Sequence, residues 1–190
     1  MKSVVTTDAY EFRLGLGHPV LELAATLAGR RTVPLERLGD PGDLSRWLEL
    51  AGLARGVDCH AQHLSDAREL REALYRLVAA ARAKRRPTAA DLELVNDWAR
   101  RPIATPQLDA SLRVTLVGSD PCRAALSQLA QAAIQLAGSA DVHRIRECAN
   151  PTCSLMYIDH SRPGRRRWCS MERCGNRVKT ARYRDKRRGV

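Results

Sequence analysis

Two short stretches near the carboxyl end of the chain each carry a pair of cysteines: Cys148-Ala149-Asn150-Pro151-Thr152-Cys153 and Cys169-Ser170-Met171-Glu172-Arg173-Cys174. Within each stretch the cysteines are separated by 4 residues, and 15 residues lie between the stretches. Two close pairs of thiolates joined by a short loop can surround one zinc ion at about 2.3 Å. Four sulfurs leave no position for water, so the sequence predicts one structural zinc ion held by Cys148, Cys153, Cys169 and Cys174.

The residues around these cysteines predict a small finger over residues 141–190. Asn150 and Pro151 supply a turn between the first two ligands, and residues 155–158 are typical of a short strand. Ser170 is a residue type that begins helices, so Cys174 is expected in the first turns of a C-terminal helix. A turn and a helix that carry ligands, with a hairpin between them, predict a treble-clef-like zinc finger.

Positive charge is concentrated in this finger. The formal net charge of the chain is +11; residues 141–190 hold 14 Lys and Arg against 5 Asp and Glu, whereas residues 1–140 hold 18 against 16. Clustered cations can contact several phosphates together, and counterion release makes such binding steeply dependent on salt. The sequence therefore predicts DNA as the partner, contacted by Arg165, Arg166, Arg167, Arg177, Lys179, Arg182 and Arg184. The same surface also fits a protein- or RNA-interaction module without sequence-specific DNA binding.

The first 140 residues predict a helical domain. Aromatic residues make up only 4% of the chain and the apolar residues are mostly Leu, Ala and Val, a composition that favours packed helices over a β-sandwich. Apolar spacing and capping residues predict helices over residues 19–28, 41–51, 65–84, 88–101, 121–138 and 140–146, with Arg68, Arg71 and Glu72 facing water. A short hairpin is predicted over residues 107–117. The predicted fold class is mainly α with a small β-hairpin (α+β).

No feature of the sequence predicts a membrane span or export. No stretch approaches the ~20 apolar residues that cross a bilayer, and residues 1–17 lack the basic and apolar segments of an export signal. We therefore expect a cytoplasmic protein whose cysteines stay reduced and available to metals. Cys59 and Cys122 are expected to be small buried side chains. His60 and His63 have no third ligand at a spacing that fits a metal.

Catalytic patterns are also missing from the sequence. It contains no phosphate-binding glycine loop, no nucleophile elbow and no arrangement typical of a catalytic triad. We therefore expect a protein that is not an enzyme. The rival hypothesis, a reaction in the first 140 residues, would require a deep pocket with converging polar groups.

A longer pattern resembles a known family. The segments 146–153, 157–162 and 166–177, which end in Cys174-Gly175-Asn176-Arg177, closely resemble the CGNR zinc finger, a family named for that tetrapeptide. In that family the finger follows an N-terminal ABATE domain, and residues 44–48 and 101–108 are similar to that domain. The resemblance implies a bacterial stress-induced transcription regulator that binds DNA. It also implies a first domain, residues 1–140, that senses a small ligand; dimerisation would suit a regulator that reads a palindrome.

Overall fold

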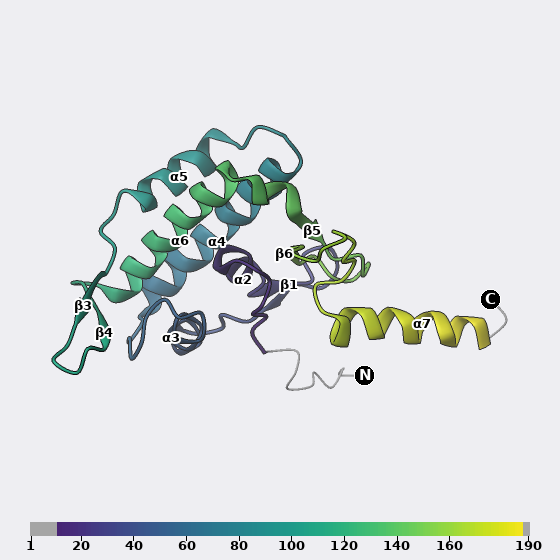
Figure 1. Cartoon of the computed structure of the whole chain (residues 1–190), viewed down its shortest axis with the longest axis horizontal. Coiled ribbons are helices and arrows are strands. Elements are labelled where there is room, and N and C mark those ends of the chain that lie inside the picture. The colour runs from purple at the N-terminus through teal and green to yellow at the C-terminus, as the bar shows by residue number, and fades with distance from the viewer. Residues whose placement is uncertain (1–10, 188–190) are drawn as a thin grey trace.

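Helices dominate the first part of the molecule. The computed structural model describes residues 11–187. The helices are α2 (Pro19–Ala24), α3 (Pro41–Leu50), α4 (Ala61–Arg82), α5 (Ala89–Ala99) and α6 (Pro121–Gly138). Helices α4, α5 and α6 pack side by side, and α2 and α3 lie against α4 and α6 (Figure 1).

Local capping residues set the starts of three helices. Asp40 accepts a hydrogen bond from the backbone of Asp43, and Asp120 and Thr88 make equivalent bonds at the starts of α6 and α5. Helix α4 starts at Ala61, four residues before its predicted start, because the His60 N–H donates to Nδ1 of His63 and closes the first turn. Helix α2 stops at Ala24 and not at the predicted residue 28, because the chain turns there into a strand.

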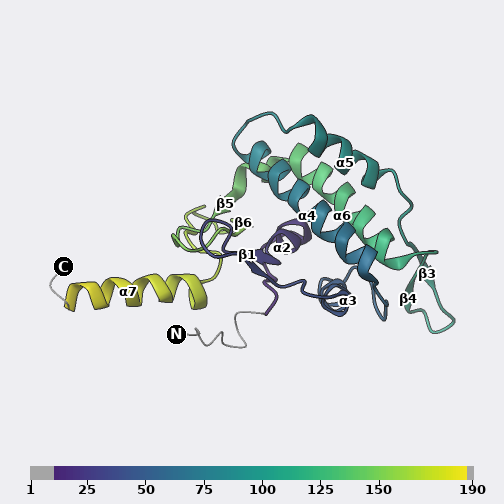
Figure 2. The ribbon, with the colours of Figure 1, turned by 180° about the vertical axis from the view of Figure 1, so that it is seen from behind.

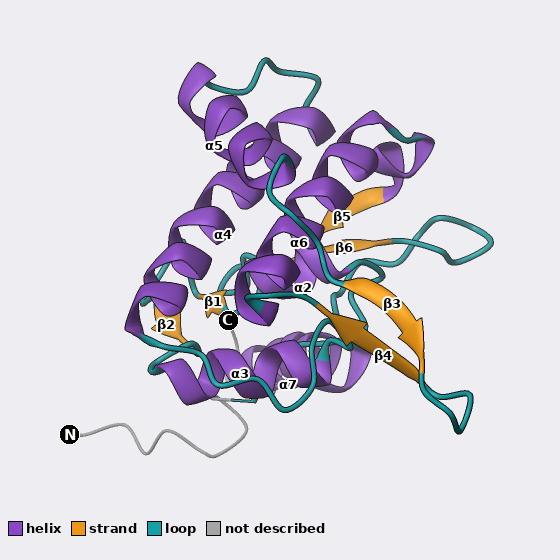
Figure 3. Cartoon of the chain, turned by 90° about the vertical axis from the view of Figure 1, so that its left-hand side faces the viewer, coloured by secondary structure: helices purple, strands orange, loops and turns teal. Residues whose placement is uncertain are grey.

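Within residues 11–187 the strands form three antiparallel pairs, each of two short strands. The pairs are β1 (Leu27–Ala28) with β2 (Leu35–Glu36), β3 (Thr105–Leu108) with β4 (Val114–Val117), and β5 (Ile145–Glu147) with β6 (Met156–Ile158). The predicted hairpin is the β3–β4 pair, which projects from the helices (Figure 3). The mainly helical fold with small strand pairs is therefore confirmed.

The predicted helix over residues 140–146 is wrong at its end. A 3₁₀ helix, η1 (Ala140–Arg144), is followed directly by β5. The reason is the pairing of Ile145 with Ile158, which draws the chain into a strand. Both isoleucines are buried, at 0% and 2% exposure, so the pairing also places apolar side chains in the core.

One hydrophobic core runs through the helices and the finger. Trp47, Leu74 and Leu126 are fully buried among the helices. Ile145 and Tyr157, from the strands of the finger, are equally buried and belong to the same cluster. The finger is therefore packed against the helical part and is not joined to it by a loose linker.

A buried ion network lies where β2 meets α4. Arg71, expected to face water, is 3% exposed and donates two hydrogen bonds of 2.6 and 2.7 Å to the Glu36 carboxylate. It also donates to Thr26 Oγ1, and Arg30 and Arg71 both donate to Glu72. The expectation failed because β1 and β2 fold over this face of α4 and supply the carboxylate. Burial raises the pKa of Glu36, but the Arg71 guanidinium outweighs that effect and holds it below its usual value.

Over the described part of the chain, each helix is too short or too polar to cross a bilayer.

Candidate zinc centre and basic surface

The four predicted ligands converge on one point. The sulfurs of Cys148, Cys153, Cys169 and Cys174 all lie within 4.8 Å of one another. The sulfurs of Cys153 and Cys169 are 3.8 Å apart, and those of Cys169 and Cys174 are 3.5 Å apart. A tetrahedron of sulfurs at about 2.3 Å from zinc has edges of about 3.8 Å, so the cluster fits one zinc ion.

Three of the four ligands are held by backbone hydrogen bonds close to them, and the Cys169 N–H donates to the Cys148 sulfur at 3.5 Å. Cys148 follows β5, and its N–H donates to the Leu155 carbonyl at 3.0 Å. Cys153 closes the turn at Asn150, to whose carbonyl its N–H donates at 2.9 Å. Cys174 lies on η2 (Met171–Gly175), a π-helical turn that Ser170 caps by accepting from the Arg173 N–H. The ligands are therefore fixed by the local fold.

The charges of the sulfurs also favour a cation. Hydrogen bonds, first of all from Cys153, lower the pKa of Cys148, whereas the nearby Cys148 raises the pKa of Cys169. The thiols thus compete for ionisation, because four thiolates this close repel one another. A divalent cation at the centre allows all four to ionise, which is the chemistry of a structural zinc site.

Asn150 contributes more than the predicted turn. Its Oδ1 accepts from the N–H and the hydroxyl of Thr152, and it is 4% exposed. Its buried Nδ2 makes no hydrogen bond of normal geometry among the described residues and acts on Cys174 instead. The neighbouring Cys148 raises the pKa of Cys174, but Cys153 and Cys169, with a smaller effect from the nearby Asn150 amide, lower it to about 7. An amide that stabilises a thiolate supports the metal from outside its ligand shell.

Gly175 lets the chain pass close to Trp168. A Cβ at this position would lie 3.1 Å from Cδ1 of Trp168 and 2.5 Å from the sulfur of Met171. Any larger residue would therefore push against the turn that carries Cys174. This is the physical reason for glycine directly after the last ligand.

The finger is tied to the helical part by polar contacts as well as by the core. The Ile158 N–H donates to the Leu16 carbonyl at 2.9 Å. Glu147, which directly precedes the first ligand, pairs with Arg31 at 2.8 Å and with Arg82 at 3.3 Å. These contacts fix the metal centre relative to α4.

The predicted DNA-contacting residues lie in two places. Arg165, Arg166 and Arg167 are in the exposed loop after β6, and the others lie on α7 (Asn176–Arg187). Arg177, Lys179 and Arg184 are exposed on α7, which extends away from the rest of the molecule (Figures 1 and 2). Arg182 is also on α7, but its side chain is outside the part that the structure describes.

Arg166 differs from its neighbours in the loop. Its guanidinium donates to the carbonyls of Trp168 and Cys169 and lies over the Tyr157 ring at 4.5 Å. Its backbone N–H donates to the Asp159 carboxylate, so both the backbone and the side chain of Arg166 hold the loop in place. Arg166 thus holds the loop that presents the other arginines.

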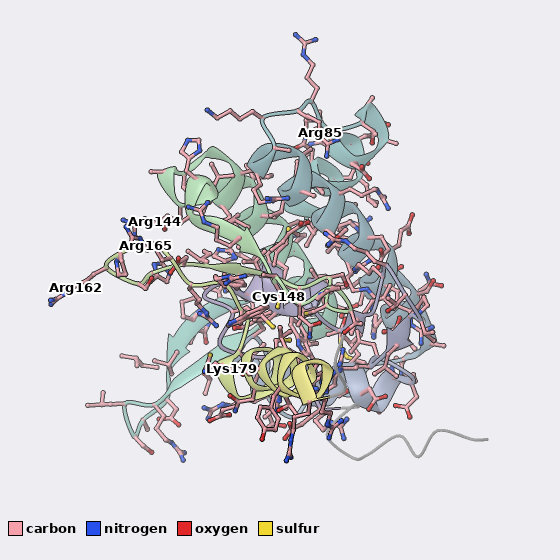
Figure 4. All side chains as sticks on the ribbon, turned by 90° about the vertical axis from the view of Figure 1, so that its right-hand side faces the viewer. Arg85, Arg144, Cys148, Arg162, Arg165 and Lys179 are labelled. Carbon is pink, nitrogen blue, oxygen red and sulfur yellow. A yellow bond between two sulfur atoms is a disulfide. The ribbon has the colours of Figure 1, made fainter. Side chains whose placement is uncertain are left out.

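Several loop cations extend into solvent. Figure 4 shows Arg162 and Arg165, from this loop, and Arg144, from the end of η1, projecting on one side of the finger, with Cys148 above α7 and Lys179 on it. Arg162 was not among the predicted contacts, although it lies in the same loop. The sequence could have indicated Arg162, because it lies three residues before the run of arginines that begins at Arg165.

Cys59 and Cys122 are buried as expected, but they are not separate thiols. A disulfide joins them across 63 residues of sequence. Their sulfurs and His63 also form a close group within 4.8 Å, so His63 does have neighbours able to bind metals. The expectation of reduced cysteines without partners is therefore wrong for this pair, because helix packing brings the start of α6 to the start of α4.

A small cavity lies between the finger and the helical part. It encloses about 130 Å³ and is lined by both parts, including Arg37, Asn150, Ser170 and Arg177. Pockets that hold organic ligands usually measure about 300–1,000 Å³. This cavity is therefore smaller than the pocket that the enzyme hypothesis requires.

Comparison with known families agrees with this architecture. The ABATE family model, described as "Putative stress-induced transcription regulator", matches residues 17–140, and the CGNR zinc finger model matches residues 144–187. No curated protein matches the chain. The descriptions name a regulator and a zinc finger, not an enzyme. With one model covering most of the helical part and the other covering all four ligands, the chain belongs to the ABATE family and carries a CGNR zinc finger with one structural zinc ion.

Proposed function

We propose that this protein is a DNA-binding transcription regulator whose zinc finger contacts duplex DNA through its exposed cations. The observation that carries the proposal is the lack of neutralising carboxylates: within residues 11–187, Arg165, Arg177 and Lys179 form no ion pair. Cations left unpaired on one part of a chain can bind phosphates without first breaking internal contacts.

Helix α7 suits such a role by its shape and exposure. It continues directly from η2, and those of its basic side chains that the structure describes are exposed to solvent. A single helix is narrow enough to enter the major groove of DNA. We assign backbone or groove contacts to Arg177, Lys179, Arg182 and Arg184, with Arg165 and Arg167 contacting phosphates from the loop. Arg166 acts indirectly, by shaping that loop.

One observation favours the alternative of a protein- or RNA-interaction module. Tyr183 on α7 is 60% exposed, and Arg187 lies 5.5 Å from its ring centre. Met171, at the start of the same helical segment, is 48% exposed. Exposed aromatic and arginine side chains are common in protein interfaces and stack on unpaired RNA bases.

Salt dependence tests the proposal. Binding of the zinc-loaded chain to a fluorescent duplex should weaken steeply between about 50 and 200 mM salt, with a log–log slope that grows by roughly 0.9 per phosphate contact. Replacing Arg177, Lys179 and Arg184 together by alanine should reduce that slope by roughly 2.7 if each contacts a phosphate. The matched control is Arg85→Ala with Arg86→Ala, two exposed arginines in the loop between α4 and α5.

Competition separates DNA from the alternative. A regulator must prefer a selected duplex over structured RNA and over a simple polyanion. Equal competition by all three, or a flat salt slope at measurable affinity, would contradict sequence-specific DNA binding.

The proposal includes further expectations. A regulator of DNA would work in the cytoplasm and would have no catalytic role. A small-molecule effector of the helical part and a homodimer are also expected. Native mass measurement with and without a specific duplex tests the dimer.

A further inference from the structure

Two cysteines outside the zinc centre are linked to each other. Cys59 lies two residues before α4, and Cys122 lies in the first turn of α6. They are 3% and 2% exposed, and their disulfide fastens together the starts of the two longest helices. Cys148, Cys153, Cys169 and Cys174 form no disulfide and are the zinc ligands. The six cysteines of the chain are thus divided between two kinds of chemistry.

These two chemistries require opposite conditions. A zinc centre of four sulfurs needs thiolates, whereas a disulfide is an oxidised pair. Zinc ligands are shielded by the metal, and the Cys59 and Cys122 sulfurs are held in contact by the packing of α4 on α6. A mild oxidant should therefore react at this pair before it reaches the zinc ligands.

We propose that Cys59 and Cys122 form a reversible dithiol–disulfide site that is oxidised by hydroperoxides while zinc remains bound. This site is independent of the proposed DNA binding. It assigns a second, separate sulfur chemistry to the helical part of the chain.

Two features near Cys122 would stabilise negative charge on its sulfur. The residue lies at the N-terminal end of an 18-residue helix, where the backbone dipole favours negative charge. His63 lies within 4.8 Å of both sulfurs, and its Nε2 is 3.3 Å from the Asp120 carboxylate. The negative charge of Asp120 opposes the dipole, but Arg123, whose Nε is 3.8 Å from the same carboxylate, partly offsets it.

The other groups around the Cys59–Cys122 pair, Asp66 and the two histidines, also have partners. Asp66 on α4 lies 3.4 Å from Arg123. The His60 ring stacks on His63 at 5.4 Å, and the His60 N–H occupies Nδ1 of His63. Both nitrogens of His63 thus already have protein partners, which favours the disulfide over a metal ion as the use of this site.

The oxidation consumes one hydroperoxide per pair. The Cys122 thiol loses its proton, and the thiolate attacks one peroxide oxygen; the O–O bond breaks, and the released hydroxide takes up a proton to become water. The Cys59 thiol then attacks the sulfenic sulfur of Cys122, the S–S bond forms, and the hydroxyl leaves with the Cys59 proton as a second water. With hydrogen peroxide, two thiols are oxidised and the peroxide is reduced to two waters. A dithiol reductant reverses the bond by exchange.

The disulfide affects the segment that connects α3 to α4. The Cys59 N–H donates to Ser45 Oγ on α3 at 3.0 Å, and Leu53 and Ala54 in the connecting segment are buried. Oxidation therefore fixes the connection between α3 and α4 onto α6. Helix α6 begins near the β3–β4 hairpin and ends beside β5, so this corner lies away from the finger (Figure 1). The zinc content should not change with the state of the pair.

The test uses the full zinc-loaded chain, reduced with dithiothreitol, desalted and treated with hydrogen peroxide. Free thiols, intact mass, peptide mapping and zinc release into a metal-binding dye are measured together. The expected result is loss of two thiols, a mass decrease of about 2 Da, a linked Cys59–Cys122 peptide, retained zinc and full reversal by dithiothreitol. Thermal unfolding should occur at a higher temperature in the oxidised chain.

Matched variants sharpen the result. Cys59→Ala with Cys122→Ala should keep its zinc and lose the peroxide response. Cys59→Ser should stop at a Cys122 sulfenic acid that dimedone traps. These variants are supplementary, because the mapping of the wild-type chain decides the question even if they fold poorly.

Three outcomes would overturn the proposal. In the first, peroxide oxidises the zinc ligands and releases zinc before the pair reacts. In the second, the disulfide resists dithiothreitol until the chain is unfolded. In the third, the reduced chain holds two zinc ions, one of which the double variant loses, so that Cys59, His63 and Cys122 are a metal site.

Discussion

Removal of zinc is expected to melt α7 while α2 to α6 stay folded. Helix α7 has 12 residues and is exposed along its length, with only Val178 half-buried among its described side chains. An isolated helix of this length is marginal in water. Zinc binding to finger peptides contributes about 10–16 kcal/mol at neutral pH. The metal, through Cys174, is therefore the main source of order for this helix.

The size of the effect follows from the helix lengths. Helices α2 to α6 contain 6, 10, 22, 11 and 18 residues, so the loss of the 12 residues of α7 should remove roughly 15% of the helical ellipticity. Far-ultraviolet circular dichroism before and after a strong chelator measures it, with released zinc counted by a dye. Trypsin should then cut rapidly within α7, and added zinc should restore both signals.

The matched variants are Cys169→Ser and Cys59→Ser. The first removes a zinc ligand and should reproduce the effect of the chelator without any chelator present. The second removes a sulfur outside the zinc centre and should retain both zinc and α7. An unchanged spectrum in a chain shown to contain no zinc would refute the structural role assigned to the metal.

Three further results are expected. Arg71→Met should lower the free energy of unfolding by about 1.5–3 kcal/mol, because the half-buried Glu36 loses its two short hydrogen bonds and keeps only Arg68, at 3.8 Å, as a charged partner. Arg100→Ala, at an exposed pair, should cost less than about 1 kcal/mol in urea denaturation. Equal costs would contradict the role assigned to the Arg71 network. Because the pKa of Glu36 is lowered in the folded chain, its ionisation stabilises the fold above the unfolded-state pKa of about 4.3, and this stability is lost as pH falls through the folded-state pKa. Glu36→Gln should therefore make the free energy of unfolding less dependent on pH in the acid range. An unchanged pH dependence would contradict the role assigned to the Glu36 carboxylate. Gly175→Ala should weaken zinc retention in competition with a chelator, because the added Cβ would press on Trp168 and Met171. The control is Gly138→Ala, where the added carbon has open space and zinc retention should not change. Identical zinc retention by the two variants would show that the close approach at Gly175 is unimportant.

The helix starts could be predicted because their causes are local. Asp40, Thr88 and Asp120 cap helices through backbone groups three residues away, so the sequence alone carries the information. The zinc ligands were accessible for a similar reason. Their type and spacing allow one chemistry, and the structure brings the four sulfurs together as that chemistry requires.

Features that depend on distant partners were missed. The sequence predicts that Arg71 faces solvent on a helix, because its partner Glu36 lies 35 residues earlier in the chain and is brought to it only by the fold. Cys59 and Cys122 read as unrelated residues until the starts of α4 and α6 are packed together. Neither pairing has a local signal, because each is decided by how helices and strands stack.

The orientation of α7 relative to the helical part also could not be predicted from the sequence. This orientation determines how a partner bound by α7 would be placed. Glu147 is bound by Arg31 and Arg82, the next residue is the first zinc ligand, and Cys174 joins the same centre to the start of α7. Rigid links thus run from α4 through the metal to the basic helix. Because Ile145 and Tyr157 lie in the same core as the helices, the finger cannot turn without disturbing that core. A partner bound by α7 is therefore held at a fixed orientation to the helical part, and a change in the packing of that part would reach the bound partner through these contacts.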